Sequence, residues 1–301
     1  MQTRKDTTRT TRSGETKTTV SIDGRIVRGT AARISVHDWG FRFGWGAFET
    51  IRIREGRPVF LSQHLERLTG TAEALLLTQT GESAWWRREI RRAIKHSRAG
   101  AGALNLYWTR GEAPSFSGHR VICIRPVPAR QRNSCTLWVA PWPLEPRTPG
   151  IGAKTLAYLP YTFSAICAQA AGFDDAVLLN ARQCIIDGGS ASVFVIEKGR
   201  LLTPPTDNGA LPGITRGAVL DQAKRLGIPA RVGTLPLKRV LSSDAVFLTS
   251  ALRGLRLVRV VGTHRLPVSP EARRIVVRLR RALDRAALDD LASFTWQAGK
   301  R

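Results

Sequence analysis

Apolar and polar residues alternate with a period of two in several short stretches of this chain, which is the pattern of half-buried β-strands. Two of these stretches, TVSIDGRIV (19–27) and AFETIRIREGRPVF (47–60), contain a turn signal, at Asp23-Gly24 and Glu55-Gly56 respectively. An acidic residue followed by glycine is typical of a hairpin turn, so both stretches are predicted to be β-hairpins. Further strands are expected at 103–110, 119–127, 175–180, 183–187, 192–204, 244–250 and 253–261.

Other stretches have their apolar residues at helical spacing. This spacing predicts a helix over residues 62–77, where the apolar positions are Leu65, Leu68, Ala72, Leu75 and Leu76. Further helices are expected at 82–98, 160–172, 215–226 and 269–290, the last of them basic and amphipathic. Strands and helices alternate in both halves of the chain, which predicts a mixed α/β (α+β) fold class.

The chain has 301 residues, about twice the length of a typical domain, and we expect two domains. Four prolines lie between residues 141 and 149, and such a cluster is typical of a linker. The predicted organisation is a flexible basic tail over 1–17, an N-terminal α/β domain over 18–140, a linker over 141–152 and a C-terminal domain over 153–301.

Composition narrows the class of protein. Hydrophobic residues make up 43% and charged residues 23% of the chain, which is typical of a globular protein and not of a disordered one. No uncharged apolar run is long enough to predict a membrane-spanning helix, so no membrane partner is expected. The first 17 residues are polar and rich in Thr and Arg, and they do not resemble a secretory signal.

The net charge is +24, from 47 basic and 23 acidic residues. A nucleic-acid-binding surface is one explanation for such an excess. Only 8 of the basic residues are Lys, however, and the Arg residues are spread along the whole chain rather than clustered. We therefore favour an arginine-rich composition over a dedicated nucleic-acid surface, although the charge would still attract anionic substrates.

The four cysteines, Cys123, Cys135, Cys167 and Cys184, have no CxxC spacing and lie in apolar stretches. A free cysteine in such a place packs as a small hydrophobic residue. The five histidines form no HExxH pair. Neither a disulfide framework nor a metal site is expected, and reduced cysteines predict a cytoplasmic protein.

Three positions suggest chemistry on their own. Gly213 precedes a predicted helix whose first N–H groups, at Ile214 and Thr215, have no partner within the helix and suit a phosphate. Capping of that helix by Thr215 is the simpler explanation. The guanidinium of Arg67 also suits a phosphate, or simply faces water. Lys154 follows the proline-rich segment, and a lysine shielded from water forms Schiff bases, whereas most single lysines are exposed and inert.

Four motifs stand in a particular order along the chain. They are FGWGAFETIR (43–52) with HLERL (64–68), KTLAYL (154–159), DGGSASVF (187–194), and TPPTDNGALPGITR (203–216) with FLTS (247–250). In this order and spacing they resemble the class IV aminotransferase family, the fold type IV enzymes of pyridoxal phosphate. The resemblance covers residues 18–265. It implies a smaller N-terminal α/β domain, a larger barrel-like C-terminal domain that binds pyridoxal 5'-phosphate, a site in the cleft between them, and a homodimer.

The resemblance also implies a role for each matching residue. Lys154 matches the lysine that forms the Schiff base with the cofactor and then moves the proton at the substrate α-carbon. Arg67 matches the phosphate-binding arginine, and Ile214 and Thr215 match the backbone cradle of the phosphate. Ser250 falls in the second turn that contacts the phosphate.

Some positions depart from the family pattern. Tyr158 resembles the tyrosine near the phenolic oxygen of the cofactor, although its spacing from the lysine varies between subfamilies. The family usually has Glu where this chain has Asp187, a carboxylate that keeps the pyridine nitrogen protonated; Asp has the same charge on a shorter side chain. Ser192 stands where Asn is usual, and Trp45 where Asp is common. We expect Trp45 to narrow the site or to alter a dimer contact.

Three subfamilies differ in short motifs. D-amino-acid aminotransferases have an Arg-x-His carboxylate trap, which is missing from residues 109–117. The turn Ser250–Gly254 resembles that of 4-amino-4-deoxychorismate lyases more than the Gly-Thr-Ala-Ala-Glu turn of branched-chain aminotransferases. Thr50 matches a threonine that assists proton transfer in those lyases. A β-branched residue is also common in a strand without any catalytic role. The arginine that many lyases have just after the motif TRG (109–111) is absent.

We therefore expect a pyridoxal-phosphate-dependent lyase that acts on aminodeoxychorismate, releases pyruvate and forms 4-aminobenzoate for folate synthesis, with Lys154 and Thr50 as catalytic residues. The alternative is a branched-chain-like amino-acid transaminase that uses 2-oxoglutarate as acceptor. A second alternative is a catalytically silent member of the family, or a polyanion-binding protein that uses the arginines of the C-terminal helix.

Overall fold

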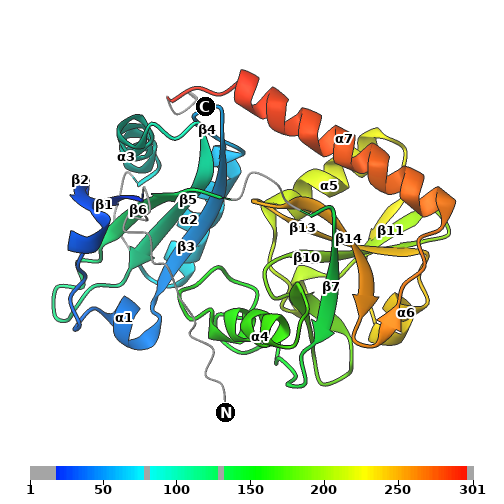
Figure 1. Ribbon diagram of the computed structural model, residues 1–301. Coiled ribbons are helices and arrows are strands. Elements are labelled where there is room, and N and C mark those ends of the chain that lie inside the picture. Colours follow the sequence, from blue (N-terminus) through cyan, green and yellow to red (C-terminus); the bar gives the residue numbers. More distant parts are fainter. Residues whose placement is uncertain (1–17, 78–81, 128–131, 297–301) are drawn as a thin grey trace, which may run out of the picture.

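The computed structural model describes residues 18–77, 82–127 and 132–296, and arranges them as two β-sheets flanked by helices (Figure 1). The fold class is mixed α/β, as the sequence predicts. The predicted tail over 1–17 lies outside the described residues. No helix in the part of the chain that the structure describes is both long and apolar enough to cross a bilayer.

The first sheet has six strands in the order β2-β1-β6-β5-β3-β4, and all neighbours are antiparallel. Its strands are β1 (Thr19–Ile22), β2 (Arg25–Arg28), β3 (Gly46–Arg54), β4 (Arg57–Pro58), β5 (Ala101–Thr109) and β6 (Arg120–Arg125). Both predicted hairpins are confirmed, because β1 pairs with β2 across Asp23-Gly24 and β3 pairs with β4 across Glu55-Gly56.

The two faces of the first sheet have different surroundings. Helices α2 (Leu61–Ala74) and α3 (Glu82–Ser97) cover one face and bury the first hydrophobic core with it (Figure 1). Side chains alternate between the faces of a strand, so Ile51 and Ile53 of β3 enter this core while Phe48 and Thr50 point to the other face. A short helix, α1 (Trp39–Phe43), precedes β3.

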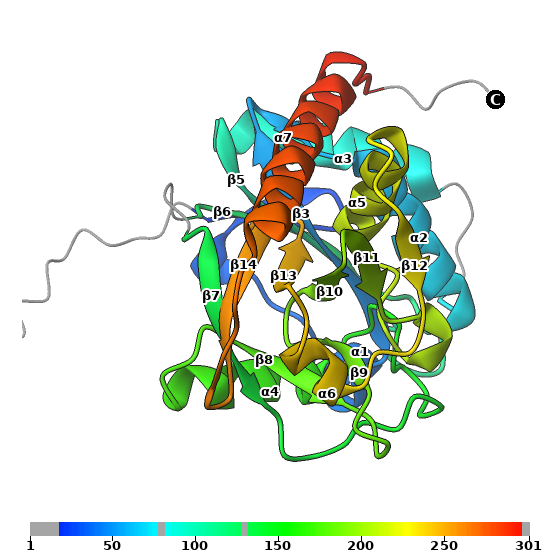
Figure 2. The same ribbon diagram turned by 90° about the vertical axis from the view of Figure 1, so that its right-hand side faces the viewer.

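The second sheet has nine strands in the order β12-β11-β10-β13-β14-β7-β8-β9, with β15 paired to β14. The strands are β7 (Ser134–Val139), β8 (Asp175–Leu179), β9 (Ile185–Gly188), β10 (Ser192–Glu197), β11 (Arg200–Thr203), β12 (Ala230–Val232), β13 (Ala245–Ser250), β14 (Gly254–Val261) and β15 (His264–Arg265). It mixes parallel and antiparallel pairs and curls on itself as a half-barrel (Figure 2). Apolar side chains of the strands fill its inner side, among them Leu137, Val195 and Leu248.

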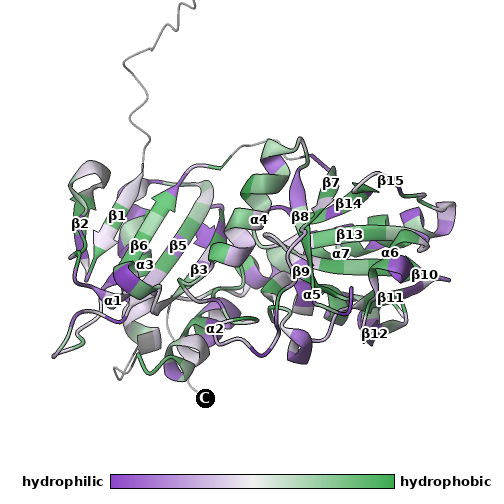
Figure 3. Ribbon diagram, turned by 90° about the horizontal axis from the view of Figure 1, so that it is seen from below, coloured by the Kyte–Doolittle hydropathy of each residue, from purple (hydrophilic) through white to green (hydrophobic). Residues whose placement is uncertain are grey.

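Helices flank the second sheet. They are α4 (Leu159–Ala170), α5 (Ile214–Arg225), α6 (Leu237–Leu241) and α7 (Pro270–Ala292). α5 and α7 pack on its outer side around Phe194 and Phe247, whose rings stack with centroids 5.0 Å apart. In Figure 3 the hydrophobic colour follows the strands of both sheets, whereas the hydrophilic colour lies mainly on loops and outer helix faces.

The C-terminal end of α7 ties the two sheets together. Arg57 of β4 donates a hydrogen bond to the carbonyl oxygen of Leu291 (2.8 Å), and the N–H of Phe60 donates to the carboxylate of Asp290 (2.6 Å). Beyond the helix, Phe294 and Trp296 pack against the first hydrophobic core. A helix that begins on the second sheet therefore ends on the first (Figure 1).

The structure adds elements that the sequence did not predict. These are α1, α6, β7, β12 and β15, all of six residues or fewer, and short elements show little periodicity. β7 lies ahead of the predicted linker at 141–152 but pairs with β8 and β14 of the second sheet. The change of sheet therefore falls between Arg125 and Ser134, ahead of the predicted linker, because the partners of β7 are distant in sequence.

Candidate active site

A cavity of about 380 Å³ lies between the two sheets and is lined by residues of both. All eight residues predicted for the site line it, namely Thr50, Arg67, Lys154, Tyr158, Asp187, Ile214, Thr215 and Ser250. Trp45 is not among the lining residues, so it does not narrow the site as expected. Its Nε1 donates to the carbonyl oxygen of Leu75 (2.8 Å), and its ring packs on the first core.

Lys154 is held in place by the backbone of β3. The N–H of Phe48 donates to the carbonyl oxygen of Lys154 (2.9 Å), and the N–H of Leu156 donates to that of Gly46 (2.8 Å). Gly46 is required here because a Cβ atom would lie 2.5 Å from the backbone carbonyl oxygen of Trp108. The segment around Lys154 therefore extends the first sheet locally and carries the lysine into the cavity between the sheets.

The amine of Lys154 lies between two aromatic rings. Its Nζ is 4.3 Å from the centroid of Phe48 and 4.7 Å from that of Tyr158. Burial lowers the pKa of Lys154 to about 8, although the nearby carboxylate of Glu49 acts in the opposite direction. A substantial fraction of this amine is therefore neutral near pH 8, which a nucleophile or a base requires.

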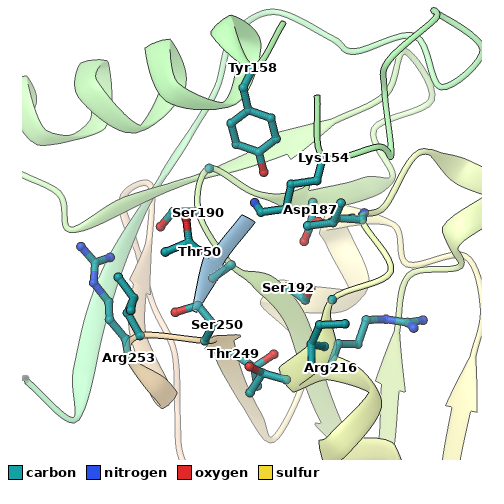
Figure 4. Close-up of a pocket in the computed structure, with 18 of the residues that line it drawn as sticks. Thr50, Lys154, Tyr158, Asp187, Ser190, Ser192, Arg216, Thr249, Ser250 and Arg253 are labelled. Atoms are coloured by element: carbon teal, nitrogen blue, oxygen red, sulfur yellow. Dashed lines mark hydrogen bonds between the residues drawn. The ribbon is translucent and has the colours of Figure 1, made fainter. Parts of the chain in front are cut away.

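Asp187 lies on β9, at the floor of the cavity. Its carboxylate accepts hydrogen bonds from the N–H groups of Leu211 and Gly188, both at 3.1 Å. Burial raises the pKa of Asp187 to about 7, and those two N–H groups act against the rise. Figure 4 shows the hydroxyl of Tyr158 directed toward Lys154 and Asp187, and burial raises the pKa of Tyr158 so that this hydroxyl keeps its proton.

The guanidinium of Arg67 is held by the carboxylate of Glu49. Phe48 and Thr50 of β3 face the cavity, whereas Glu49 points to the opposite face of the strand. Glu49 accepts hydrogen bonds from Nε and a terminal nitrogen of Arg67, at 2.7 and 2.8 Å, and its other partner is Nδ1 of His64 at 2.7 Å. Burial alone would raise the pKa of Glu49, but its bonds to His64 and Arg67 lower it to about 2. Another Arg67 nitrogen donates to the carbonyl oxygen of Pro212 (2.9 Å), which fixes the arginine beside α5.

The N-terminus of α5 forms one end of the cavity. Gly213 precedes the helix and offers no side chain to cap it, so the N–H groups of Ile214 and Thr215 are available to an anion. A Cβ atom at Gly213 would lie 2.8 Å from Oγ of Ser192, so a larger residue there would require the Ser192 side chain to move. The buried hydroxyl of Thr249, next to Ser250, has no hydrogen-bond partner among the described residues.

Several lining residues were missed by sequence reasoning. His64 of the HLERL motif lines the cavity, and Glu49 of the FETIR motif lies behind it, bonded to His64 and Arg67. The alternation of β3 could have indicated that Glu49 faces α2. Arg216, one residue after Thr215, donates to Oγ1 of Thr203 (3.3 Å) and to the carbonyl oxygen of Pro204 (2.9 Å). No local signal marks Arg125 or Arg253, which also line the cavity.

Comparison with known proteins identifies the family. The model of the family "Amino-transferase class IV" matches residues 46–261. A bifunctional aminodeoxychorismate lyase / D-amino acid transaminase of Mycobacterium tuberculosis is 27% identical over 273 residues, which are 84% of this chain and 94% of that protein. A Methanocaldococcus jannaschii protein provisionally named a branched-chain-amino-acid aminotransferase is 29% identical over 241 residues, 76% of this chain and 83% of that protein.

A solved structure confirms the architecture. The pyridoxal-phosphate-bound form of a hypothetical aminotransferase from Mycobacterium tuberculosis has a TM-score of 0.81 and 24% sequence identity, and the match covers 91% of this chain and 99% of that one. The fold is thus the two-domain fold type IV architecture. The chain belongs to the class IV aminotransferase family, and it is an enzyme of the pyridoxal-phosphate-dependent class.

The residues of the cavity fit the cofactor that this family implies. A phosphate suits the free N–H groups at the start of α5, the unpartnered hydroxyl of Thr249 and the guanidinium of Arg67. An aldehyde suits the amine of Lys154, because burial lowers its pKa. A ring nitrogen suits the buried carboxylate of Asp187. These are the three kinds of group that pyridoxal phosphate presents to a protein.

Proposed function

We propose that the protein is a 4-amino-4-deoxychorismate lyase, which releases pyruvate from its substrate and leaves 4-aminobenzoate. The observation that carries the proposal is the setting of Thr50. Its Oγ1 accepts a hydrogen bond from Nδ2 of Asn105 (2.9 Å), so its own proton is directed elsewhere. Thr50 lines the same cavity as Lys154, two residues along β3 from the Phe48 ring that contacts the lysine.

The residues divide the reaction between them. When bound, pyridoxal phosphate supplies an aldehyde for the substrate amine and a ring that accepts the electron pair of a carbanion. Arg67 and the start of α5 would hold the phosphate group, and the carboxylate of Asp187 would hold the ring nitrogen. The neutral amine of Lys154 takes the proton from the carbon that bears the substrate amine. As the bond between the ring carbon and the enolpyruvyl oxygen breaks, the Thr50 hydroxyl donates its proton to that oxygen.

Two further observations support this proposal. None of residues 109–117, where an Arg-x-His trap would stand, is among the residues that line the cavity. The relative in Mycobacterium tuberculosis, matched over 94% of its length, has a name that includes aminodeoxychorismate lyase. The same name also includes D-amino acid transaminase, so this relative supports the lyase reaction without setting it against transamination.

The test is to supply aminodeoxychorismate to the holoenzyme and to measure pyruvate and 4-aminobenzoate. We expect equal amounts of both products without any acceptor. The variant Thr50→Val should slow their release by about 10²-fold, the usual contribution of a positioned acid, and Thr50→Ser should restore most of the rate. Absence of 4-aminobenzoate from an otherwise intact holoenzyme contradicts the proposal.

The second candidate is a transaminase acting on an amino acid with 2-oxoglutarate as acceptor. It is favoured by the names of relatives, since the Methanocaldococcus jannaschii protein is named after branched-chain amino acids. This candidate requires glutamate to form from 2-oxoglutarate when leucine, isoleucine or valine is supplied. The same holoenzyme preparation therefore decides between the two reactions.

We also propose that the enzyme is a homodimer. Two helices present large apolar side chains to solvent on the same side of the molecule, α1 with Phe41 (71% exposed) and α4 with Leu159 (73%) and Ile166 (57%) (Figure 1). Surface of this kind marks a protein contact. Sedimentation should give twice the chain mass of 33.1 kDa, and Leu159→Asp should shift the protein toward the monomer.

A further inference from the structure

One face of the first sheet carries a row of polar side chains toward the cavity. Thr50 of β3 is paired with Asn105 of β5, and Asn105 is paired with Cys123 of β6. Because side chains alternate along a strand, Arg125 points to the same face as Cys123 and Asn105. Thr50 and Arg125 both line the cavity, with Asn105 between them.

Asn105 links the two residues by hydrogen bonds. Its Nδ2 donates to Oγ1 of Thr50 (2.9 Å), and its Oδ1 accepts from Nε of Arg125 (3.3 Å). Asn105 is buried, whereas Arg125 is exposed to the cavity side. The terminal nitrogens of Arg125 make no hydrogen bond to other described residues, so the planar fork of the guanidinium is available to a carboxylate.

A second guanidinium lines the same cavity. Arg253 lies in the turn between β13 and β14 and is 4.0 Å from the buried carboxylate of Asp175, which also accepts a hydrogen bond from Ser190 (2.6 Å). Figure 4 places Arg253, Ser190 and Thr50 on the side of the cavity away from Arg216. Arg253 therefore stands away from Arg216 of α5, and Arg125 lies on the sheet face that carries Thr50.

Arg110 lies within residues 109–117, where the Arg-x-His trap is missing, and its guanidinium is directed away from the cavity. The guanidinium of Arg110 stacks on the ring of Phe116, 4.5 Å from its centroid, and lies 5.6 Å from that of Trp45. It also donates a hydrogen bond to the carbonyl oxygen of Leu76. Arg110 does not line the cavity, so a carboxylate in this chain must be recognised from another element.

We propose that Arg125, supported by Arg253, forms a carboxylate subsite that selects substrates with a second carboxylate, on the side of the cavity that carries Thr50. The proposal deepens the proposed function and rests on it for the orientation of the substrate amine toward Lys154. Aminodeoxychorismate and 2-oxoglutarate both carry a second carboxylate, so the subsite serves either reaction. Asn105 then has two tasks, to orient Arg125 for the substrate and to orient the hydroxyl of Thr50.

The experiment measures how tightly two unreactive acids of equal chain length bind to the holoenzyme by titration calorimetry. Glutarate has two carboxylates and pentanoate has one. We expect glutarate to bind the wild-type holoenzyme at least tenfold tighter, and Arg125→Met to weaken glutarate roughly 10- to 100-fold, the value of a charge-assisted hydrogen-bonded pair. The affinity for pentanoate should not change.

Three further variants sharpen the test. Arg125→Lys keeps the charge but loses the planar fork of the guanidinium, so it should keep only part of the affinity for glutarate. This variant replaces Arg125→Met if Arg125→Met does not fold. Arg253→Met should weaken glutarate by a smaller factor, because Arg253 already faces Asp175. Arg25→Met removes an exposed arginine of β2 in the same sheet, outside the cavity, and should change nothing.

Two results would overturn the proposal. One is equal binding of glutarate and pentanoate to the wild-type holoenzyme, and the other is an unchanged preference in Arg125→Met. The proposed function fails by a different result, since a holoenzyme that prefers glutarate but forms no 4-aminobenzoate keeps the subsite and loses the lyase. A protein that forms 4-aminobenzoate with equal binding of both acids loses only the subsite.

Discussion

The two ends of the cavity are built in different ways. At the α5 end, Arg67 is held by Glu49 and Pro212, and Gly213 lies close against the side chain of Ser192. At the end formed by the first sheet, Arg125 is exposed, and within the described part of the chain its Nε donates one hydrogen bond, at 3.3 Å, to Asn105. A cofactor end that is fixed in advance suits a group bound in every cycle, whereas a looser end lets the choice of substrate depend on a few side chains.

Lys154 lies between the two ends, and its loss should have the largest effect. Lys154→Ala removes the group that takes the proton, so turnover should fall by at least about 10³-fold. Circular dichroism should remain that of the wild type, because the backbone contacts to β3 do not need the side chain. The matched control is Lys198→Ala. Lys198 is exposed, lies in the turn between β10 and β11, and does not line the cavity. Retained turnover in Lys154→Ala would show that another group does this work.

Breaking the ion pair between Glu49 and Arg67, near the α5 end of the cavity, should have the second largest effect. Glu49→Gln keeps the shape but removes the counter-charge of Arg67, whose side chain is 12% exposed, which should cost about 2 kcal/mol of unfolding free energy. The dissociation constant for pyridoxal phosphate should rise as well, because Arg67 is no longer held. Glu73→Gln changes an exposed residue of α2, the helix that carries Arg67, and serves as the control in urea unfolding. If Glu49→Gln matches this control in both measurements, Arg67 is oriented by other contacts.

The same carboxylate predicts how stability depends on acid. The pKa of Glu49 is about 2 in the folded protein, against an ordinary value of 4.5. A carboxyl with a lowered pKa stabilises the fold fully above its ordinary pKa, and this contribution is lost as the pH falls from about 4.5 toward about 2. Thermal unfolding at a series of pH values should show a smaller decline for Glu49→Gln than for the wild type. Parallel declines would contradict the lowered pKa.

The amine between the two ends predicts a pH dependence of its own. The pKa of Lys154 is about 8, against an ordinary value of 10.5, because the amine is buried. Only the neutral amine attacks an aldehyde, so the rate at which the apoprotein captures pyridoxal phosphate should rise with pH and level off above about 8. Stopped-flow absorbance measures this rate directly. A rise that continues toward pH 10.5 would mean that the amine is solvated.

A single methyl group should have the smallest effect. Gly213→Ala places a Cβ atom near Oγ of Ser192 at the α5 end, and the backbone angle φ of −64° at this position is one that alanine accepts. The affinity for pyridoxal phosphate should fall by roughly 10-fold, the effect of about 1.4 kcal/mol of crowding. The double variant Gly213→Ala, Ser192→Gly should regain most of it. No rescue would indicate that crowding against Ser192 is not the cause.

The sequence predicts the fixed end of the site better than the variable end. Period-two alternation locates β3 and its hairpin, and the motifs that carry Lys154, Arg67 and Thr215 converge on one cavity. The pairing of Glu49 with Arg67 requires β3 and α2 to be placed against each other, which no local pattern states. The three-strand row from Thr50 to Arg125 depends on the register of β5 and β6, and register is a property of the whole sheet.

The order of strands in the second sheet could not be predicted from the sequence pattern either. β7 lies between β14 and β8 in parallel pairing, although β14 follows it by more than one hundred residues, and its six residues gave no periodic signal. Parallel partners are chosen by what packs on both faces of the sheet, so the pattern within one strand cannot name its neighbours.

The central claim is that this cavity binds pyridoxal phosphate through Lys154, and one measurement tests it most directly. The purified protein is mixed with pyridoxal phosphate, its visible absorption spectrum is recorded, and it is then reduced with borohydride and mapped by peptide mass. We expect an absorption band of the bound cofactor and a reduced adduct on Lys154 alone. No band, or an adduct spread over exposed lysines, would contradict it.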